Sequence, residues 1–255
     1  MPKNIALITG ATSGIGLAIA EQFAANGIDL ILTGRRAERL SESKAKLEKE
    51  FGIEVHTLCF DIRQQADCEQ AIQSLPAAWT SIRYLINNAG LASGLGKIYE
   101  GKLSDWEQMI DTNVKGLLYM SRLVIPMLMA NKQGHIVNIS SIAGKEVYAN
   151  GNVYCASKFA VDALNKGMRI ELAESGIRVT SINPGAVNTE FSLVRFHGDA
   201  ERAEKVYEGF DPLMAQDIAD AVYYAISRPA HVNINEMIIM PTAQPVASII
   251  HRKSN

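Results

Sequence analysis

Thr9-Gly10-Ala11-Thr12-Ser13-Gly14-Ile15-Gly16 is the stretch that decides the fold. It follows an apolar run at residues 5–9 and opens a segment of helical spacing at 14–26. Glycines allow a tight turn and close approach of the backbone to a pyrophosphate, and the helix start presents free N–H groups to it. A plain strand-to-helix turn is the alternative, but the position after the first strand favours a phosphate loop. We therefore predict that a dinucleotide is bound by Gly10, Thr12, Ser13, Gly14, Ile15 and Gly16.

The same alternation of apolar runs and helical spacing continues along the chain. We predict strands at residues 5–9, 28–33, 55–60, 83–87, 135–139, 177–183 and 236–240, and helices at 14–26, 37–51, 67–75, 104–130, 153–175 and 216–227. Apolar strands without polar alternation are typical of a sheet that is buried on both faces. The pattern predicts an α/β protein with a single doubly wound parallel sheet (Rossmann-like), helices on both faces, and one domain over residues 1–255.

Two segments carry more local expectations. Ser104, with Glu107 three residues later, has the spacing of a capping box at the start of the helix predicted over 104–130. Residues 184–212 show no clear period. Because ligands bind beyond the carboxyl ends of the strands in such sheets, we expect this irregular segment to cover the substrate.

Composition and charge exclude several classes of partner. The 255 residues carry a formal net charge of -2, which gives no electrostatic basis for binding nucleic acid or an anionic membrane. No stretch is long and apolar enough to span a bilayer, and the first apolar run is too short for a signal peptide. The three cysteines are scattered and have no metal-ligand spacing, so no metal is expected. A cytoplasmic protein is the expectation.

Two arginines follow the second predicted strand, where NAD-specific folds carry an acid for the ribose hydroxyl. Arg35 and Arg36 leave no carboxylate there to repel a 2′-phosphate, and two guanidinium groups are able to clamp it. A solvated basic turn is the alternative, although a cation at a helix start opposes the helix dipole. We therefore predict NADP(H) rather than NAD as the cofactor.

Tyr154 and Lys158 stand four residues apart at the start of a predicted helix, so they share one face. An ammonium near a phenol stabilises the phenolate and is expected to lower the pKa of Tyr154 from about 10. Tyr154 would then exchange a proton with a substrate oxygen while a hydride moves at the neighbouring carbon. Ser141, with Ser140 as its rival, ends the fifth strand and is placed to hold the same oxygen.

These motifs together resemble the short-chain dehydrogenase/reductase family, over essentially the whole chain. The resemblance implies that Tyr154, Lys158 and Ser141 are catalytic and that Asn113 anchors a water beyond the lysine. It also implies that Asp61, with Ile62 after it, accepts from the adenine amino group. The remaining cofactor contacts that it implies are Asn87, Asn88, Ala89 and Gly90 after the fourth strand, Tyr154 and Lys158, and Pro184, Gly185, Val187 and Thr189 beside the nicotinamide.

Two further stretches, residues 189–196 and 229–235, are similar to a narrower group within that family: NADP-dependent 3-hydroxy acid dehydrogenases, also described as serine dehydrogenases or malonic semialdehyde reductases. This resemblance implies a small hydroxy acid or semialdehyde as substrate and a homotetramer. A hydroxy acid needs a cation for its carboxylate. Arg195 is the first candidate and His197 the second, against the alternative of a surface arginine on a mobile loop.

Two other functions remain open at this point. A broad NADPH carbonyl reductase for ketones, sugars or acyl thioesters would share the same motifs, because the covering segment decides the substrate. A non-catalytic NADP-binding regulator is the other, although both Tyr154 and Lys158 are present. The apolar stretch at residues 240–250 is expected to pack on another subunit.

Overall fold

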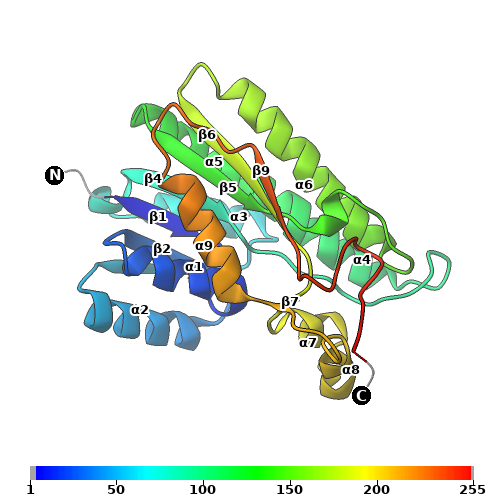
Figure 1. Cartoon of the computed structure of the whole chain (residues 1–255). Helices are drawn as coiled ribbons and strands as arrows, with labels where there is room; N and C mark the ends of the chain where they lie inside the picture. Colours follow the sequence, from blue (N-terminus) through cyan, green and yellow to red (C-terminus); the bar gives the residue numbers. More distant parts are fainter. Residues whose placement is uncertain (1–3, 254–255) are drawn as a thin grey trace.

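Seven parallel strands form the central sheet of the molecule. The computed structural model describes residues 4–253, and its strand order is β3-β2-β1-β4-β5-β6-β9. The strands are β1 (Ile5–Ile8), β2 (Asp29–Gly34), β3 (Val55–Cys59), β4 (Ile82–Asn87), β5 (Gly134–Ile139), β6 (Ile177–Pro184) and β9 (Glu236–Ile239) (Figure 1). The order reverses between β1 and β4, and a crevice for a ligand opens at such a reversal. All seven predicted strands are present, and the predicted fold class is confirmed.

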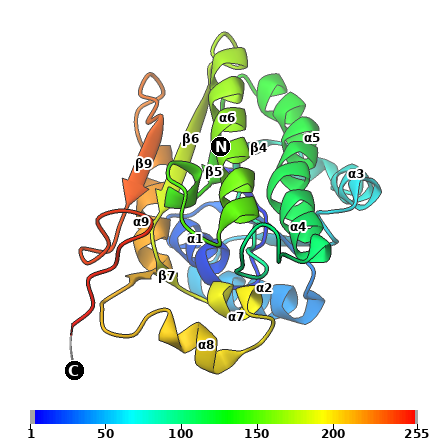
Figure 2. The ribbon, with the colours of Figure 1, turned by 90° about the vertical axis from the view of Figure 1, so that its right-hand side faces the viewer.

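Helices cover both faces of this sheet (Figure 2). On one face lie α1 (Gly14–Ala24), α2 (Ala37–Phe51) and α9 (Ala215–Ile226), and on the other lie α3 (Gln65–Gln73), α5 (Leu117–Ala130) and α6 (Asn152–Glu171). Neighbouring residues of one strand enter different hydrophobic cores: Ile8 packs in the cluster with Phe23, and Leu7 in the cluster with Val124. Burial on both sides explains why the strands read as continuous apolar runs.

The helix predicted over 104–130 is interrupted in the structure. It consists of α4 (Leu103–Ile110), a π-helical turn at Asp111–Gly116 (η2) and α5. The side chain of Asn113, inside the π turn, exchanges hydrogen bonds with the backbone of Leu91. A π turn accommodates one extra residue in a helix, and such turns are frequent at functional sites. Residues 104–130 are therefore helical as predicted, but the sequence pattern did not indicate the π turn.

The predicted capping box is wrong. The N-cap of α4 is Lys102 and its side chain makes no capping bond, while Ser104 lies inside the first turn. Tertiary contacts set this helix start: Asp105 accepts a 2.7 Å hydrogen bond from the hydroxyl of Ser93, and Gly101 leaves room for the ring of Trp106. The far end of α6 likewise falls at Glu171, short of the predicted residue 175.

Residues 184–212 contain short elements that gave no period in the sequence. They include α7 (Phe191–Arg195) and α8 (Ala200–Lys205), and β7 (Val187–Asn188) pairs with β8 (Leu213–Met214), just beyond the segment. Helices of five and six residues do not complete two turns, so no repeat of apolar positions arises. The segment lies beyond the carboxyl ends of the strands, as predicted (Figure 1).

The stretch after β9 folds back on its own chain. Gln244 is buried, and its Oε1 accepts a 2.8 Å hydrogen bond from the backbone N–H of Ala186. Arg252 donates a 3.0 Å bond to the carbonyl of Val206 and lies over the ring of Phe210. The end of the chain therefore contacts the segment 184–212, and packing of residues 240–250 on another subunit stays a prediction.

No helix among residues 4–253 is long and apolar enough to cross a membrane. No group of histidine, cysteine, aspartate or glutamate among them is arranged to hold a metal ion. The cysteines are all free: Cys59 is exposed at the end of β3, whereas Cys68 and Cys155 are buried. Burial raises the pKa of the Cys68 thiol to about 12.

Candidate active site

One long cavity crosses the carboxyl ends of the strands, from β2 and β3 past β1 and β4 to β5 and β6. It brings together most of the predicted site residues, namely Gly10, Thr12, Ser13, Gly14, Ile15, Arg35, Arg36, Asp61, Ile62, Asn88, Ala89, Gly90, Ser141, Tyr154, Lys158, Pro184, Gly185, Val187 and Thr189. Its wall also contains Ser140, the rival of Ser141, and Glu190, Phe191 and Val194, which were not predicted as site residues. Motifs separated by more than 100 residues along the chain therefore meet in one site.

The phosphate loop depends on glycine for two reasons. Gly10 and Gly14 have φ angles of 67° and 55°, in the left-handed region that side chains disfavour. Gly16 lies behind the cavity wall, where an added Cβ would stand 2.4 Å from Gly10 O and from Asn88 Nδ2. Gly16 thus acts through close packing of α1 on the loop, one of the roles that glycine has in nucleotide-binding turns.

A threonine that the motifs did not single out organises the neighbouring loop. The hydroxyl of Thr9 accepts hydrogen bonds from the backbone N–H groups of Asn88 (3.0 Å) and Ala89 (2.9 Å). Asn88 Nδ2 in turn donates to the carbonyls of Thr9 and Gly10. These bonds join the loops after β1 and β4 at the switch point of the sheet.

Asn87 does not lie where the sequence placed it. Its side chain is buried in the interior and donates to Ser121 Oγ (3.1 Å) and Asn138 Oδ1 (2.9 Å). It is the last residue of β4, and side chains alternate across a strand, so Asn87 points to a core while Asn88 borders the cavity. Its assignment as a cofactor contact is therefore corrected to a structural role between β4, β5 and α5.

The two arginines after β2 have different surroundings. Arg36 donates to Thr12 Oγ1 (3.0 and 2.7 Å), to Ser13 Oγ (2.7 Å) and to Glu190 Oε2 (2.9 Å). Arg35 is exposed and makes no hydrogen bond or ion pair with any residue from 4 to 253. Its guanidinium is free to meet an anionic group at this end of the cavity.

Asp61 also lines this end, beside Ile62. Both of its carboxylate oxygens accept from Arg63: Oδ1 accepts from Nε at 3.0 Å, and Oδ2 accepts from Nε at 3.0 Å and from Nη2 at 2.5 Å. The hydrogen bonds from Arg63 lower the pKa of Asp61, against the effect of burial, so the carboxylate is ionised. An ionised acceptor at this position is compatible with the predicted bond to an adenine amino group.

Ser141, Tyr154 and Lys158 converge at the other end of the cavity. Tyr154 and Lys158 lie on consecutive turns of α6, and Lys158 Nζ stands 5.9 Å from the centre of the Tyr154 ring. Lys158 Nζ donates to the carbonyl of Ile139 (3.0 Å), at the end of β5. The Ser141 hydroxyl faces the phenol, while the hydroxyl of its rival Ser140 is directed to the Lys158 carbonyl at 3.4 Å.

Burial determines the ionisation of this pair. It raises the pKa of the Tyr154 phenol well above its ordinary value, and Tyr148 acts in the same direction. The charge of Arg195 and the hydrogen bond with Ser141 act in the opposite direction. Burial also lowers the pKa of Lys158 to about 8. The expected lowering of the Tyr154 pKa is thus reversed in sign, because removal from water disfavours the charged form of each group.

Asn113 supports the site from behind the cavity wall. Its Nδ2 donates to the carbonyl of Leu91 (2.8 Å) and to Ser157 Oγ (3.0 Å), and its Oδ1 accepts from the Leu91 N–H (2.8 Å). Asn113 therefore joins the π turn to the loop after β4 and to α6 beside Lys158. The water-anchoring role implied by the resemblance remains a prediction.

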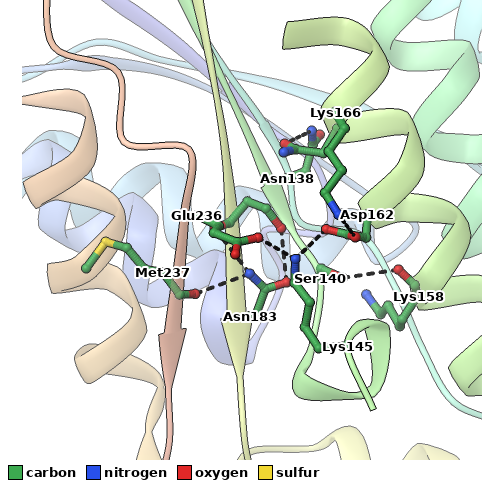
Figure 3. A network of polar contacts seen from close by, with 11 residues as sticks. Asn138, Ser140, Lys145, Lys158, Asp162, Lys166, Asn183, Glu236 and Met237 are labelled. Carbon is green, nitrogen blue, oxygen red and sulfur yellow. Dashed lines mark hydrogen bonds and ion pairs between the residues drawn. The ribbon is translucent and has the colours of Figure 1, made fainter. Parts of the chain in front are cut away.

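An ion-pair network joins α6 to the loop after β5 and to β9 (Figure 3). Lys145, four residues after Ser141, lies between Asp162 of α6 (2.6 Å) and Glu236 of β9. The second oxygen of Asp162 accepts from Lys166 (2.7 Å). Asp162 is one turn beyond Lys158, so the network fixes the part of α6 that carries the lysine.

Arg195 lies at the margin of the cavity, against Tyr154. Its guanidinium carbon is 5.0 Å from the centre of the Tyr154 ring and 5.2 Å from that of Phe191. Its Nη2 donates to the hydroxyl of Tyr148 (2.8 Å), whereas its buried Nε has no partner among the described residues. His197, the second candidate, is directed away: its Nε2 lies 3.5 Å from Asp105 of α4.

Known proteins share this arrangement. The short chain dehydrogenase family matches residues 4–198. The chain belongs to the short chain dehydrogenase family. The NADP-dependent 3-hydroxy acid dehydrogenase YdfG of Salmonella typhi is 48% identical over 250 residues, which are 97% of this chain and 99% of that protein. Sulfoacetaldehyde reductase 2 of Chromohalobacter salexigens is 43% identical over 243 residues, 95% of this chain and 96% of that protein.

Among solved structures, the closed form of a serine dehydrogenase complexed with NADP+ superposes with a TM-score of 0.91 at 45% identity, over 98% of this chain and 100% of that one. Together with the family, these relatives show that this short chain dehydrogenase is an NADP-dependent oxidoreductase acting on CH–OH groups of a small molecule. The residues fit NADP: Gly10 and Gly14 line the cavity at the start of α1, and Arg35, which makes no hydrogen bond or ion pair within residues 4–253, supplies a cation just after β2.

Proposed function

We propose that this short chain dehydrogenase acts on a small 3-hydroxy acid, such as serine, 3-hydroxypropionate or 3-hydroxybutyrate, or on the corresponding carbonyl compound. The observation that carries the proposal is the buried Nε of Arg195, which has no partner in the described structure and lies beside the ring of Tyr154. An unpaired buried N–H is costly unless it meets an acceptor. A carboxylate is the acceptor that matches a guanidinium best.

Tyr148 supports this role of Arg195. Its hydroxyl holds Nη2, so the guanidinium presents its remaining donors in a fixed orientation. Arg195 belongs to α7, whose other residues, Phe191 and Val194, line the cavity. A substrate whose carboxylate binds Arg195 would carry its 3-hydroxyl toward Tyr154 and Ser141. A neutral ketone, sugar or thioester would leave the charge of Arg195 uncompensated, and this disfavours a general carbonyl reductase.

The proposed chemistry assigns one task to each remaining residue. NADP, held by the glycine loop and the arginines after β2, would supply the hydride acceptor for oxidation and, in its reduced form, the hydride donor for reduction. Ser141 holds the substrate oxygen by a hydrogen bond. Tyr154 exchanges the proton with that oxygen, and a phenol with a raised pKa holds its proton at neutral pH, ready for donation to a carbonyl oxygen. Lys158, held by the Ile139 carbonyl, adds positive charge near the phenol. Asn113 joins the π turn to α6 through Ser157.

Substrate preference tests the proposal. Reduction of NADP+ would be followed with L-serine, D-serine, 3-hydroxypropionate, 3-hydroxybutyrate, 2-hydroxyethanesulfonate and a neutral secondary alcohol in parallel. We expect the wild type to turn over the acids. Because Arg195→Met removes a charge-assisted contact, it should reduce kcat/KM for the acids by about 100-fold. It should change kcat/KM for the neutral alcohol little. Tyr154→Phe should abolish turnover of every substrate while NADPH still binds.

Arg202→Met is the matched control, because Arg202 lies in α8 of the same segment, and its guanidinium stacks over Phe196 and is not part of the cavity wall. It should leave the preference for acids intact. Turnover of the neutral alcohol alone would rule out the hydroxy-acid assignment and support the carbonyl reductase. Preference for the sulfonate would keep Arg195 as the anion site and move the substrate class toward that named for the Chromohalobacter salexigens relative.

A further inference from the structure

Glu190 connects the two ends of the cavity. It precedes α7 directly, and its carboxylate reaches across to the arginines that follow β2. Its Oε2 accepts from Arg36 Nη1 (2.9 Å) and its Oε1 from Arg39 Nη1 (2.7 Å). The side chain is 41% exposed, so the contact lies at the surface of the cavity mouth. The segment 184–212 is thereby tied to the region where the adenosine 2′-phosphate of NADP is expected.

All three nitrogens of the Arg36 guanidinium are already engaged within the chain. Nε and Nη2 donate to the hydroxyls of Thr12 and Ser13, and Nη1 donates to Glu190. A phosphate that approaches Arg36 must therefore either replace one of these acceptors or share a nitrogen with it. Arg35 makes no hydrogen bond or ion pair among residues 4–253, although its charge acts on nearby Asp61, and it does not face this competition.

The charge of Glu190 makes sharing unfavourable. Burial acts to raise its pKa, but hydrogen bonds from Arg39, Arg36 and Ser13 hold that pKa at about 2. The carboxylate is therefore ionised at every pH at which the enzyme would work. A phosphate monoester carries a charge of about -1.5 to -2 near neutral pH. Two anions on one guanidinium repel each other, so binding of the second weakens the first.

We propose that Glu190 and the 2′-phosphate of NADP compete for Arg36, so that cofactor binding partly releases α7 from the adenosine end of the cavity, where Arg39 still holds Glu190. Arg35 then remains the permanent phosphate ligand, and Arg36 changes partner. The neighbours of Glu190 give the exchange a consequence, since Phe191 packs on the Tyr154 ring at 5.6 Å and Arg195 lies over the same ring. The phosphate that distinguishes NADP from NAD would thus influence the residues beside the reacting group. This inference concerns the cofactor end and holds for any substrate.

Equilibrium binding without turnover gives the first test. Dissociation constants of NADP+, NAD+ and 2′,5′-ADP would be measured by calorimetry for the wild type, Glu190→Gln and Glu38→Gln. Glu38 is the matched control, because it is an exposed acid in the first turn of α2 with no ion pair among the described residues. Glu190→Gln should bind NADP+ and 2′,5′-ADP about three- to tenfold more tightly, with NAD+ unchanged, and the gain should shrink as salt is added. Glu38→Gln should change the dissociation constants of NADP+ and 2′,5′-ADP less than Glu190→Gln does.

Three results would overturn the proposal. Weaker NADP+ binding by Glu190→Gln would mean that Glu190 holds Arg36 in position for the phosphate. An equal change for NAD+ would place its effect at the pyrophosphate or nicotinamide. No change in any constant would mean that Arg36 does not exchange partners.

Hydrogen exchange of residues 190–196 gives a second test, with a ligand that has no nicotinamide end. In the wild type, 2′,5′-ADP should increase amide exchange in this stretch, whereas 5′-ADP, which lacks the 2′-phosphate, should not. In Glu190→Gln the stretch should exchange faster from the start and respond to neither ligand. Slower exchange on binding of 2′,5′-ADP, or no response in the wild type, would contradict release of α7.

Discussion

Lys158 is a buried cation that has no carboxylate partner among the described residues. The residue is 5% exposed, and within residues 4–253 its Nζ donates only to the Ile139 carbonyl. Burial accordingly lowers its pKa to about 8 in the folded protein, from about 10.4 in an unfolded chain. Between these values the unfolded state binds more protons, so folding stability rises with pH there. Below pH 8 the cost of burying the charge is present in full.

Lys158→Met should therefore stabilise the protein. At pH 7 we expect an increase of roughly 1–3 kcal/mol in the free energy of unfolding, because the desolvation of the charge is relieved while one hydrogen bond is lost. This increase should become smaller as the pH approaches 10. Urea unfolding of both proteins at pH 7 and pH 9.5 measures it. Lys49→Met, on the exposed side of α2, is the control and should change little at either pH. A less stable Lys158→Met protein at pH 7 would show that the bond to Ile139 outweighs the desolvation.

At the scale of elements, α6 is held by two lysines that bind one carboxylate. Lys145 and Lys166 approach Asp162 at 2.6 and 2.7 Å, but the Lys145 side chain is 17% exposed and that of Lys166 52%. Lys145 also neutralises Glu236, which would otherwise face Asp162 (Figure 3). Removing one partner of a buried pair leaves an uncompensated charge, whereas an exposed pair contributes little.

The two lysines should consequently differ in their effect on stability. Lys145→Met should lower the free energy of unfolding by about 2–3 kcal/mol, and Lys166→Met by less than about 1 kcal/mol. Chemical denaturation followed by far-UV circular dichroism gives both values. Equal losses would mean that burial of Lys145 does not strengthen its ion pair.

The sequence predicts elements well where a local pattern suffices. Seven apolar runs predicted seven strands, and the five inner strands of the sheet are buried on both faces. The π turn was missed because its cause is Asn113, which bonds the backbone of Leu91, 22 residues earlier. Helices α7 and α8 were missed because each is too short to repeat an apolar face.

The candidate site, too, could be predicted where a local sequence pattern carries it. The glycine loop and the Tyr154–Lys158 pair are local patterns, and most of the predicted positions line one cavity. The contact between Glu190 and Arg36 joins residues 154 positions apart, and no spacing in the chain points to it. The raised pKa of Tyr154 was also out of reach, because it depends on burial that composition does not reveal.

At the scale of the whole molecule, the two hydrophobic cores share one sheet. β1 contributes Ile8 to one and Leu7 to the other, and the core beside α1 also contains Ile218 of α9, near the other end of the chain. Loss of either core would expose the strands that support the second. We therefore expect residues 4–253 to unfold as one cooperative domain.

The two tryptophans allow this to be measured. Trp79 belongs to the core beside α3 and α5, and Trp106 packs against the small cluster around Tyr154. Fluorescence of Trp79→Phe and Trp106→Phe, each with one tryptophan left, should give the same urea midpoint as circular dichroism of the same variant. An earlier transition of the Trp106 signal would identify the α4 region as a separate unit.

Cys59 is an exposed thiol at which the folded protein can be labelled. Cys68 and Cys155 are buried, so a maleimide dye should attach to the folded protein at one thiol without any engineered cysteine. Cys59 ends β3, and Phe60, Asp61 and Ile62 directly after it line the cavity. A fluorophore on that sulfur would report nucleotide binding in real time, at the opposite end of the site from the chemistry.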